Sequence, residues 1–125
     1  MKDEFVIHTP SVTATKYWPG DLGMFASHSI VFARCLAEGN DYGVQPFMVQ
    51  IRDTETWKIC PGVKCGDLGP KIGYNGKNNG WASFDSVRIP RMNMMMGLCE
   101  FSREGKFKLK GDPRVLYSVM MAIRM

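Results

Sequence analysis

Glycine and proline divide this chain into short segments rich in β-branched and aromatic residues. The sequence contains 13 glycines and 7 prolines, and only its last residues have a helical pattern. Residues 5–9 are strand-forming and stop at Pro10, and residues 27–37 form a longer, mostly apolar run. Runs of this composition between glycine and proline are typical of strands. We therefore predict a mainly β fold, an antiparallel β-barrel or sandwich.

Two of the predicted strands follow each other closely enough to pair. Residues 38–41 form a turn between residues 27–37 and 44–51, and so short a connection favours antiparallel pairing. The near-continuous apolar centre of the first strand predicts burial on both of its faces. Residues 61–80 are rich in glycine and are predicted to form short strands joined by tight turns. Further strands are predicted at residues 11–18, 81–85, 87–89 and 107–109.

The end of the chain is predicted to be helical. Asp112 suits an N-cap, and Pro113 suits the first helical position, where its missing N–H is not needed. We divide the chain into a β domain over residues 1–111 and the start of a helical region over residues 112–125. The tetrapeptide Gly-Asp-Leu-Gly occurs twice, at residues 20–23 and 66–69, but the flanking residues do not repeat. We therefore interpret it as a coincidence and not as a duplication.

Size and composition are those of an ordinary globular domain. A chain of 125 residues with 45% hydrophobic residues can bury about two-thirds of its unfolded surface. No apolar run approaches the roughly 18 residues that span a bilayer, so no membrane partner is expected. No apolar stretch follows the charged first residues, so no signal peptide is expected.

The net charge of +4 comes mainly from scattered basic residues. Only residues 106–110 concentrate them, and there lysines alternate with apolar residues, which predicts a strand with one solvent-exposed face. A nucleic-acid groove is the alternative interpretation, but we do not expect nucleic acid as a partner. A mildly basic balance also suits an anionic small ligand.

Residues that could catalyse a reaction or bind a metal are few. Cys60 and Cys65 are the only cysteines near each other, and neither His8 nor His28 is placed to complete a zinc site. We expect no metal, and we expect the four cysteines to be reduced and mostly buried. His28 lies between two serines, but neighbours on a strand point to opposite faces, so they do not form a catalytic set. No catalytic residue is assigned.

The segment Lys16-Tyr17-Trp18-Pro19-Gly20 differs in kind from the rest of the chain. Two aromatic residues end a predicted strand, and a sharp Pro-Gly turn then exposes the backbone. Glycine lets a planar ligand approach the main chain because it has no Cβ, and an indole offers a flat apolar wall with one donor. Composition alone leaves two interpretations open: core packing of Tyr17 and Trp18, or a wall for a ring-shaped ligand.

The same segment carries a resemblance to a known family. It is similar to the Lys-Trp-Trp-Pro-Gly-Gly-Leu-Gly segment of peroxisomal acyl-CoA oxidases. Similarity with the family's spacing extends over nearly the whole chain, through residues 27–31, 43–52, 61–63, 66–71, 79–80 and 87–94. The chain thus resembles the middle β domain of an acyl-CoA oxidase, and its last residues resemble the start of the helical region that follows.

The resemblance implies a function for the parent enzyme. Members of the family desaturate fatty acyl-CoA between the α and β carbons, with FAD as cofactor and O2 as electron acceptor, giving H2O2 in fatty acid β-oxidation. It also implies a peroxisomal location, helical partner domains in the same enzyme, and a parent homodimer. The family's catalytic glutamate belongs to the C-terminal region, so this chain alone is expected to be inactive. The methionine-rich residues 92–96 would pack against neighbouring domains.

Site residues are carried over from the family one by one. The glycine after Trp-Pro contacts the flavin in the family, which makes Gly20 the first candidate, with Trp18 near the ring and Pro19 shaping the turn. Asp21 stands where the family often has glycine. It would put a carboxylate near a ring whose reduced form is anionic.

Two other functions remain as alternatives. The first is a free-standing β-barrel that binds CoA esters or single-stranded nucleic acid. The second is a related acyl-CoA dehydrogenase, but those enzymes usually carry a hydroxyl residue at the flavin turn, which Pro19-Gly20 lacks.

Overall fold

The computed structural model describes residues 3–123, which form nine strands, two short 3-10 turns and one helix. In chain order the elements are β1 (Glu4–Ile7), η1 (Val12–Ala14), β2 (Lys16–Gly20), β3 (His28–Ala37), β4 (Asn40–Gln50), β5 (Val63–Asp67), β6 (Asn79–Phe84), β7 (Val87–Pro90), η2 (Arg91–Asn93), β8 (Cys99–Phe101), β9 (Phe107–Leu109) and α1 (Pro113–Ile123).

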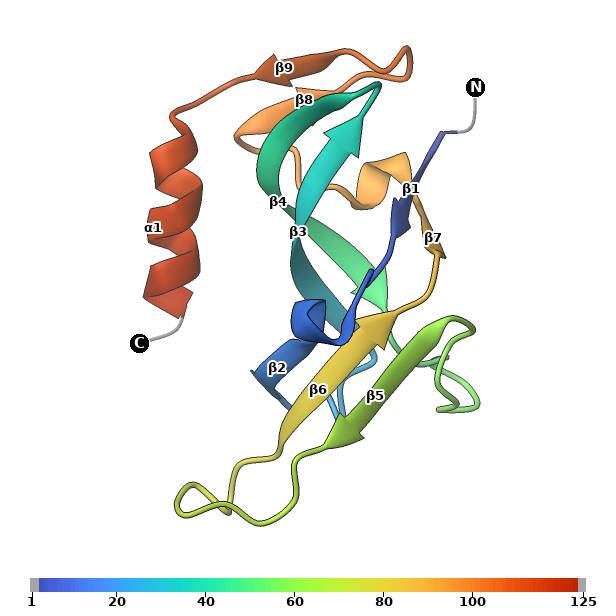
Figure 1. Ribbon diagram of the computed structural model, residues 1–125, viewed down its shortest axis with the longest axis vertical. Coiled ribbons are helices and arrows are strands. Elements are labelled where there is room, and N and C mark those ends of the chain that lie inside the picture. The colour runs from blue at the N-terminus through green and yellow to red at the C-terminus, as the bar shows by residue number, and fades with distance from the viewer. Residues whose placement is uncertain (1–2, 124–125) are drawn as a thin grey trace.

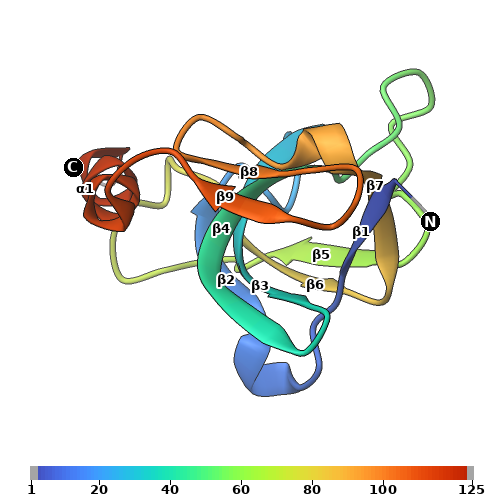
Figure 2. The same cartoon turned by 90° about the horizontal axis from the view of Figure 1, so that it is seen from above.

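The strands pair in four small antiparallel sheets. β1 pairs with β7, β3 with β4 and β8 with β9, while β6 lies between β2 and β5. The three-stranded sheet lies at one end of the long axis and the β8–β9 pair at the other, with the β3–β4 hairpin running between them (Figure 1). Figure 2, which looks along that axis, shows α1 beside the strands. The predicted mainly β class with antiparallel pairing is confirmed.

The β3–β4 hairpin is the longest pairing in the described part of the chain. Its register runs from His28 opposite Gln50 to Ala37 opposite Asn40, as the short turn predicts. The predicted burial of β3 on both faces is wrong for this chain: Val31 and Cys35 are buried, but Ile30 and Leu36 are exposed. The hairpin packs on the core with one face only, so its apolar outer residues remain at the surface.

The region before the candidate site departs from the predicted strand over residues 11–18. Residues Val12–Ala14 form η1, and β2 begins only at Lys16 and continues through Pro19 and Gly20. Local bonds compete with the ladder here, because Ala14 N–H donates to Ser11 O over 3.0 Å and the Ser11 and Thr13 hydroxyls lie 2.7 Å apart. β8 was not predicted, since three residues are too few to show a pattern.

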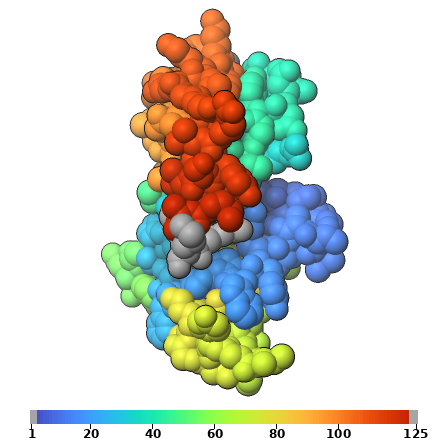
Figure 3. Space-filling view, turned by 90° about the vertical axis from the view of Figure 1, so that its left-hand side faces the viewer, coloured from blue at the N-terminus to red at the C-terminus, as the bar shows by residue number. Residues whose placement is uncertain are grey.

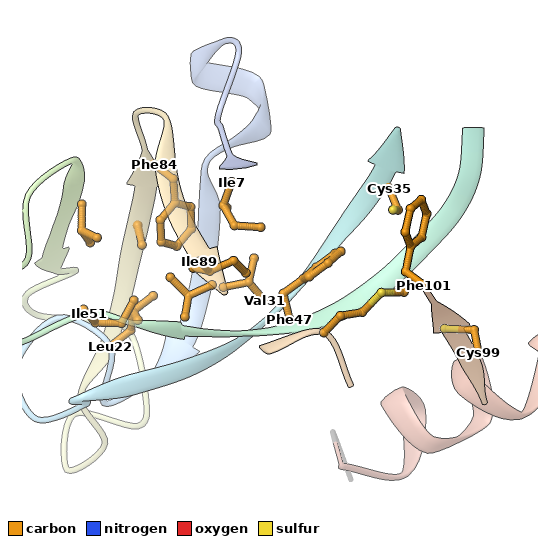
Figure 4. Close-up of a cluster of buried hydrophobic side chains, with 14 residues drawn as sticks. Ile7, Leu22, Val31, Cys35, Phe47, Ile51, Phe84, Ile89, Cys99 and Phe101 are labelled. Atoms are coloured by element: carbon orange, nitrogen blue, oxygen red, sulfur yellow. The ribbon is translucent and has the colours of Figure 1, made fainter. Parts of the chain in front are cut away.

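One continuous core joins the sheets. Its 14 buried residues come from every strand except β2 and β9, together with Leu22, Ile51 and Met94 from loops, and they follow the β3–β4 hairpin from Ile51 to Phe101 (Figure 4). Met94 is among the most deeply buried of them, which differs from the expected surface role of residues 92–96, whereas Met92 and Met95 are exposed. The four cysteines are free, with Cys35 and Cys99 buried. Burial raises the pKa of both of these thiols.

The helix starts where the sequence predicts. Arg114 N–H donates to the Asp112 carboxylate over 2.9 Å, so Asp112 caps the helix. α1 runs along the outside of the molecule, and its apolar residues Val115, Tyr117 and Val119 are exposed (Figure 3). The last two residues of the predicted helical region, 124 and 125, lie outside the described residues. Within residues 3–123, no helix has the length and apolar character needed to cross a membrane.

Candidate functional site: the turn after strand β2

The candidate segment forms a β-bulge at the end of β2. Tyr17 pairs with Trp81 and Gly20 with Asn79, so Trp18 and Pro19 together oppose Gly80 alone. Trp18 has a φ of 79°, in the left-handed region that a bulky side chain rarely adopts. Such backbone strain costs about 1–3 kcal/mol and gathers at functional sites, where bulges also redirect side chains.

The bulge turns two aromatic side chains to the surface. Tyr17 is 70% exposed and Trp18 47% exposed. Their ring centroids lie 6.2 Å apart with the planes tilted by 38°. The core-packing interpretation of these residues is therefore wrong. An exposed aromatic pair beside Gly20 and Pro19 is compatible with the second interpretation, a wall for a ring-shaped ligand.

Asn79 holds the bulge from behind. It is only 6% exposed, and its amide donates to Trp18 O over 2.9 Å. The next peptide bonds continue the support, since Asp21 N–H donates to Asn78 O over 2.6 Å. Within residues 3–123 the buried Asn79 Oδ1 has no hydrogen-bond partner. Burying an amide whose oxygen has no partner costs free energy. The hydrogen bond from the same amide to Trp18 O offsets part of that cost and holds the bulge.

Three glycines let the turn pack directly on the backbone of the sheet. A Cβ on Gly23 would lie 2.5 Å from Asp67 N and 2.6 Å from the carbonyl carbon of Gly66. A Cβ on Gly80 would overlap Gly23 N and lie 2.9 Å from Gly66 O. The two Gly-Asp-Leu-Gly tetrapeptides thus contact each other in space, although this does not make them a duplication. Only the absence of side chains permits the contact.

Arg52 fixes the loop that follows the turn. It is 5% exposed, and its guanidinium donates to three carbonyls, Leu22 O over 3.1 Å, Gly23 O over 2.7 Å and Ala26 O over 2.9 Å. The sequence analysis did not assign Arg52 a role. A single arginine after an apolar strand gives no sign of which distant carbonyls it will bind.

Lys77 covers the turn from the β5–β6 loop. Its Nζ lies 2.8 Å from Asp21 Oδ2, and its Cε lies 2.8 Å from where a Cβ on Gly20 would stand. The loop lies against the turn in the space-filling view (Figure 3). The expected carboxylate of Asp21 is therefore paired with an ammonium group. This pairing could not be predicted from local patterns, because 56 positions separate the two residues.

The remaining polar candidates do not come together. His28 is exposed, with its Nδ1 3.2 Å from Ser27 Oγ, and His8 lies near Asp85, with its Nδ1 3.7 Å from Asp85 Oδ1. Lys16, at the start of β2, donates to Phe32 O over 2.7 Å, and burial lowers its pKa. Among the described residues, no group of three or more His, Cys, Asp or Glu side chains could hold a metal ion.

Comparison with known proteins assigns the fold to a family. The chain is 45% identical to peroxisomal acyl-coenzyme A oxidase 1 of Arabidopsis thaliana over 126 residues, and 42% identical to a probable acyl-coenzyme A oxidase of Caenorhabditis elegans over 124 residues. The structure of the Arabidopsis acyl-CoA oxidase 1 superposes with a TM-score of 0.87. The chain is homologous to the β domain of acyl-CoA oxidases. No protein-family model matches it.

This homologous β domain accounts for a small part of the relatives. The match with the Arabidopsis enzyme covers 98% of this chain and 19% of that protein. The chain also superposes with a TM-score of 0.93 and 39% identity on acyl-CoA oxidase-2 of Caenorhabditis elegans, solved with FAD, ascaroside-CoA and ATP, covering 98% of this chain and 18% of that one. The chain therefore corresponds to a domain-sized portion of an acyl-CoA oxidase.

Proposed function

We propose that the chain is the FAD- and acyl-CoA-facing β domain of an acyl-CoA oxidase, with the turn after β2 forming one wall of the flavin pocket. The observation that carries the proposal is the strained bulge, which exposes Trp18 beside the accessible backbone of Gly20. The homologous oxidase solved with FAD and a CoA ester supports the same ligands for the parent enzyme.

Three residues of the turn fit a flat ring. The Trp18 indole offers an apolar face, and Pro19 restricts the backbone so that the face keeps its direction. Gly20 has no Cβ, and the place a Cβ would take is bordered by the end of the Lys77 side chain and not by backbone. These residues would bind and orient the ring. A bound flavin would supply the hydride-accepting chemistry, with O2 as the final electron acceptor.

The chain supplies no proton-abstracting base of its own in this proposal. By the family resemblance the catalytic glutamate lies in the C-terminal region, and carboxylates near the turn have other partners, such as Lys77 for Asp21. We therefore expect no oxidation of acyl-CoA by the isolated chain. The exposed apolar face of α1 and the outer face of β3 would be covered by the helical domains of the parent enzyme.

The same proposal covers the enzyme class, location, substrate and oligomeric state of the parent enzyme. The chain is that of an oxidase and not a dehydrogenase, because its matched relatives are oxidases and Pro19-Gly20 carries no hydroxyl. The Arabidopsis relative is named as peroxisomal, and we extend that location to the parent of this chain. We also propose fatty acyl-CoA as substrate and a homodimeric parent.

A domain exchange tests the proposal. The matching segment of the Arabidopsis oxidase is replaced by this chain, and FAD content and peroxide production are measured. The chimera is expected to retain both, and Gly20→Val is expected to weaken FAD binding by about tenfold or more, since a branched side chain would occupy the ring's approach. Gly73→Val, at a glycine with open space around it, is the matched control.

Two results would contradict the proposal. One is a folded chimera without FAD, or one in which Gly20→Val leaves FAD binding unchanged. The other is sustained peroxide production by the isolated chain with FAD and a long-chain acyl-CoA, which would place a catalytic base within these residues.

A further inference from the structure

The ion pair between Asp21 and Lys77 beside the turn is not explained by its contribution to stability. Asp21 and Lys77 are both about half exposed, and surface pairs of this kind contribute little to stability. Yet Lys77 lies against Gly20, with Nζ 3.2 Å from the Cβ position, and Asp21 directly follows Gly20. The pair therefore sits at the residue that the proposed function assigns to the flavin.

The loop that carries Lys77 is built to hold it there. Asp21 N–H donates to Asn78 O over 2.6 Å, which ties the residue after Lys77 to the turn. Lys71 Nζ donates to Lys77 O over 2.9 Å, and Asn75 bridges the backbone of Lys71 through two bonds, of 2.7 and 2.9 Å. Lys77 N–H also donates to Tyr74 O over 3.0 Å, so the Lys77 backbone is hydrogen-bonded on both sides, and its ammonium reaches back over the turn.

The electrostatic consequence follows from the sign of each group. Asp21 alone would present a negative charge at the turn, and a reduced anionic flavin would be repelled by it. Charge near the ring is one of the means by which a protein sets the properties of a flavin. An ammonium 2.8 Å from the carboxylate cancels most of that repulsion and leaves the turn with no net charge.

We propose that Lys77 is a positioning residue for the reduced flavin: it neutralises Asp21 and keeps the turn compatible with an anionic ring. The inference rests on the proposed function and deepens it, because it names the group on this chain that favours the reduced over the oxidised cofactor. Lys77 acts through its charge and through Asp21 and takes no part in bond breaking.

The first test uses the chain itself and needs no flavin. Iodide, an anionic quencher, and acrylamide, a neutral one, are compared on Trp18 at low salt, with the Trp18→Phe form of each variant subtracted to remove the other tryptophans. Lys77→Met is expected to lower the iodide-to-acrylamide quenching ratio by about twofold, because an unpaired carboxylate repels the anion. Asp21→Asn added to Lys77→Met should restore the ratio.

Lys64→Met is the matched control. Lys64 is exposed on β5 of the same sheet, so this variant removes one positive charge at another place. An unchanged ratio in Lys77→Met, or an equal fall in Lys64→Met, overturns the inference whether or not the isolated chain binds FAD.

The second test measures the flavin in the domain-exchange enzyme. Lys77→Met is expected to weaken binding of reduced relative to oxidised FAD by about threefold, which lowers the two-electron reduction potential by about 14 mV. Loss of FAD from the exchange enzyme that retains Lys77 counts against the proposed function. Normal FAD content with an unchanged potential in Lys77→Met overturns the inference alone.

Discussion

The two ends of the domain are held together by different means. At the aromatic end, formed by Phe5, Tyr42, Phe47, Phe101 and Phe107, rings pack edge to face, stacked or tilted, with centroids 4.5 to 6.1 Å apart. At the glycine end, formed by Gly23, Gly66 and Gly80 with Arg52 and Asn79, backbone packs on backbone and polar side chains bind carbonyls. Side chains at the aromatic end can adjust by rotating, whereas the backbone atoms in contact at the glycine end cannot. We therefore expect the backbone at the glycine end, which carries the candidate site, to be the more rigid of the two.

The largest effect is expected from removing a ring at the aromatic end. Phe101 is buried, contacts Phe5 and Tyr42 edge to face, and accepts a bond from Arg91 NH1 at its carbonyl. Phe101→Ala should lower the free energy of unfolding by about 4 kcal/mol, through lost burial and the cavity left behind. Urea denaturation measures it. Phe101→Leu is expected to lose less than half as much, and an equal loss would show that ring shape, not volume, dominates this end.

Adding a single methyl group at Gly23 is expected to lower the free energy of unfolding nearly as much as removing the Phe101 ring. The Cβ of Gly23→Ala would meet the backbone of Asp67 and Gly66, which has no side-chain freedom to yield. We expect a loss of about 3 kcal/mol in the free energy of unfolding. Gly73→Ala is the control, since nothing lies within 4 Å of its Cβ position. If both variants unfold at the same urea concentration, the backbone contact does not hold this end together.

The next largest loss of stability is expected from replacing Arg52, which binds three carbonyls. Arg52→Met keeps the length of the side chain but leaves Leu22 O, Gly23 O and Ala26 O without their donor. We expect a loss of about 2 kcal/mol in stability and a shift of Trp18 fluorescence as the turn loosens. Arg88→Met, which removes an exposed pair with Glu4, should cost less than about 1 kcal/mol. Equal losses in thermal unfolding for the two variants would show that the buried bonds of Arg52 add nothing.

Acid should weaken the aromatic end. The hydrogen bond from Arg91 lowers the pKa of Asp3 below its ordinary value, and the hydrogen bond from Lys110 lowers the pKa of Glu100. Because these pKa values are lower in the folded state, the carboxylates stabilise the fold above pH 4 and lose that contribution as the pH falls through the folded pKa. We expect stability to fall below about pH 4, and less steeply in Asp3→Asn. Parallel stability curves for Asp3→Asn and the unaltered chain, followed by fluorescence against pH, would exclude Asp3 as a source.

Much of the fold could be predicted from local patterns. The glycine and proline spacing indicated short strands, the turn at residues 38–41 indicated the β3–β4 hairpin, and Asp112-Pro113 indicated the helix start. These features depend on neighbours in the chain. The predicted strand over residues 11–18 failed in its first half for the same local reason, because the Ser11 and Thr13 hydroxyls bind each other and Ala14 N–H donates to Ser11 O there.

The candidate site was predicted in part. The resemblance selected Trp18, Pro19 and Gly20. Composition could not decide whether Tyr17 and Trp18 pack in the core or form a wall for a ring-shaped ligand. Their exposure depends on the bulge, which arises from the pairing of β2 with residues about sixty positions later. Lys77, Asn79 and Arg52 were not assigned roles, because each acts on an atom distant in sequence.

The resemblance to a family selected the segment that we propose to face a ring-shaped ligand. The sequence by itself determined the β class, the hairpin and the helix cap. These follow from side-chain shape and backbone preference within a few residues. Only the tertiary structure decided that Trp18 is strained and exposed, that the three glycines touch backbone to backbone, and that Asp21 is paired with Lys77. The physical reason is that these contacts join separate strands and loops, so they exist only once the sheets have assembled.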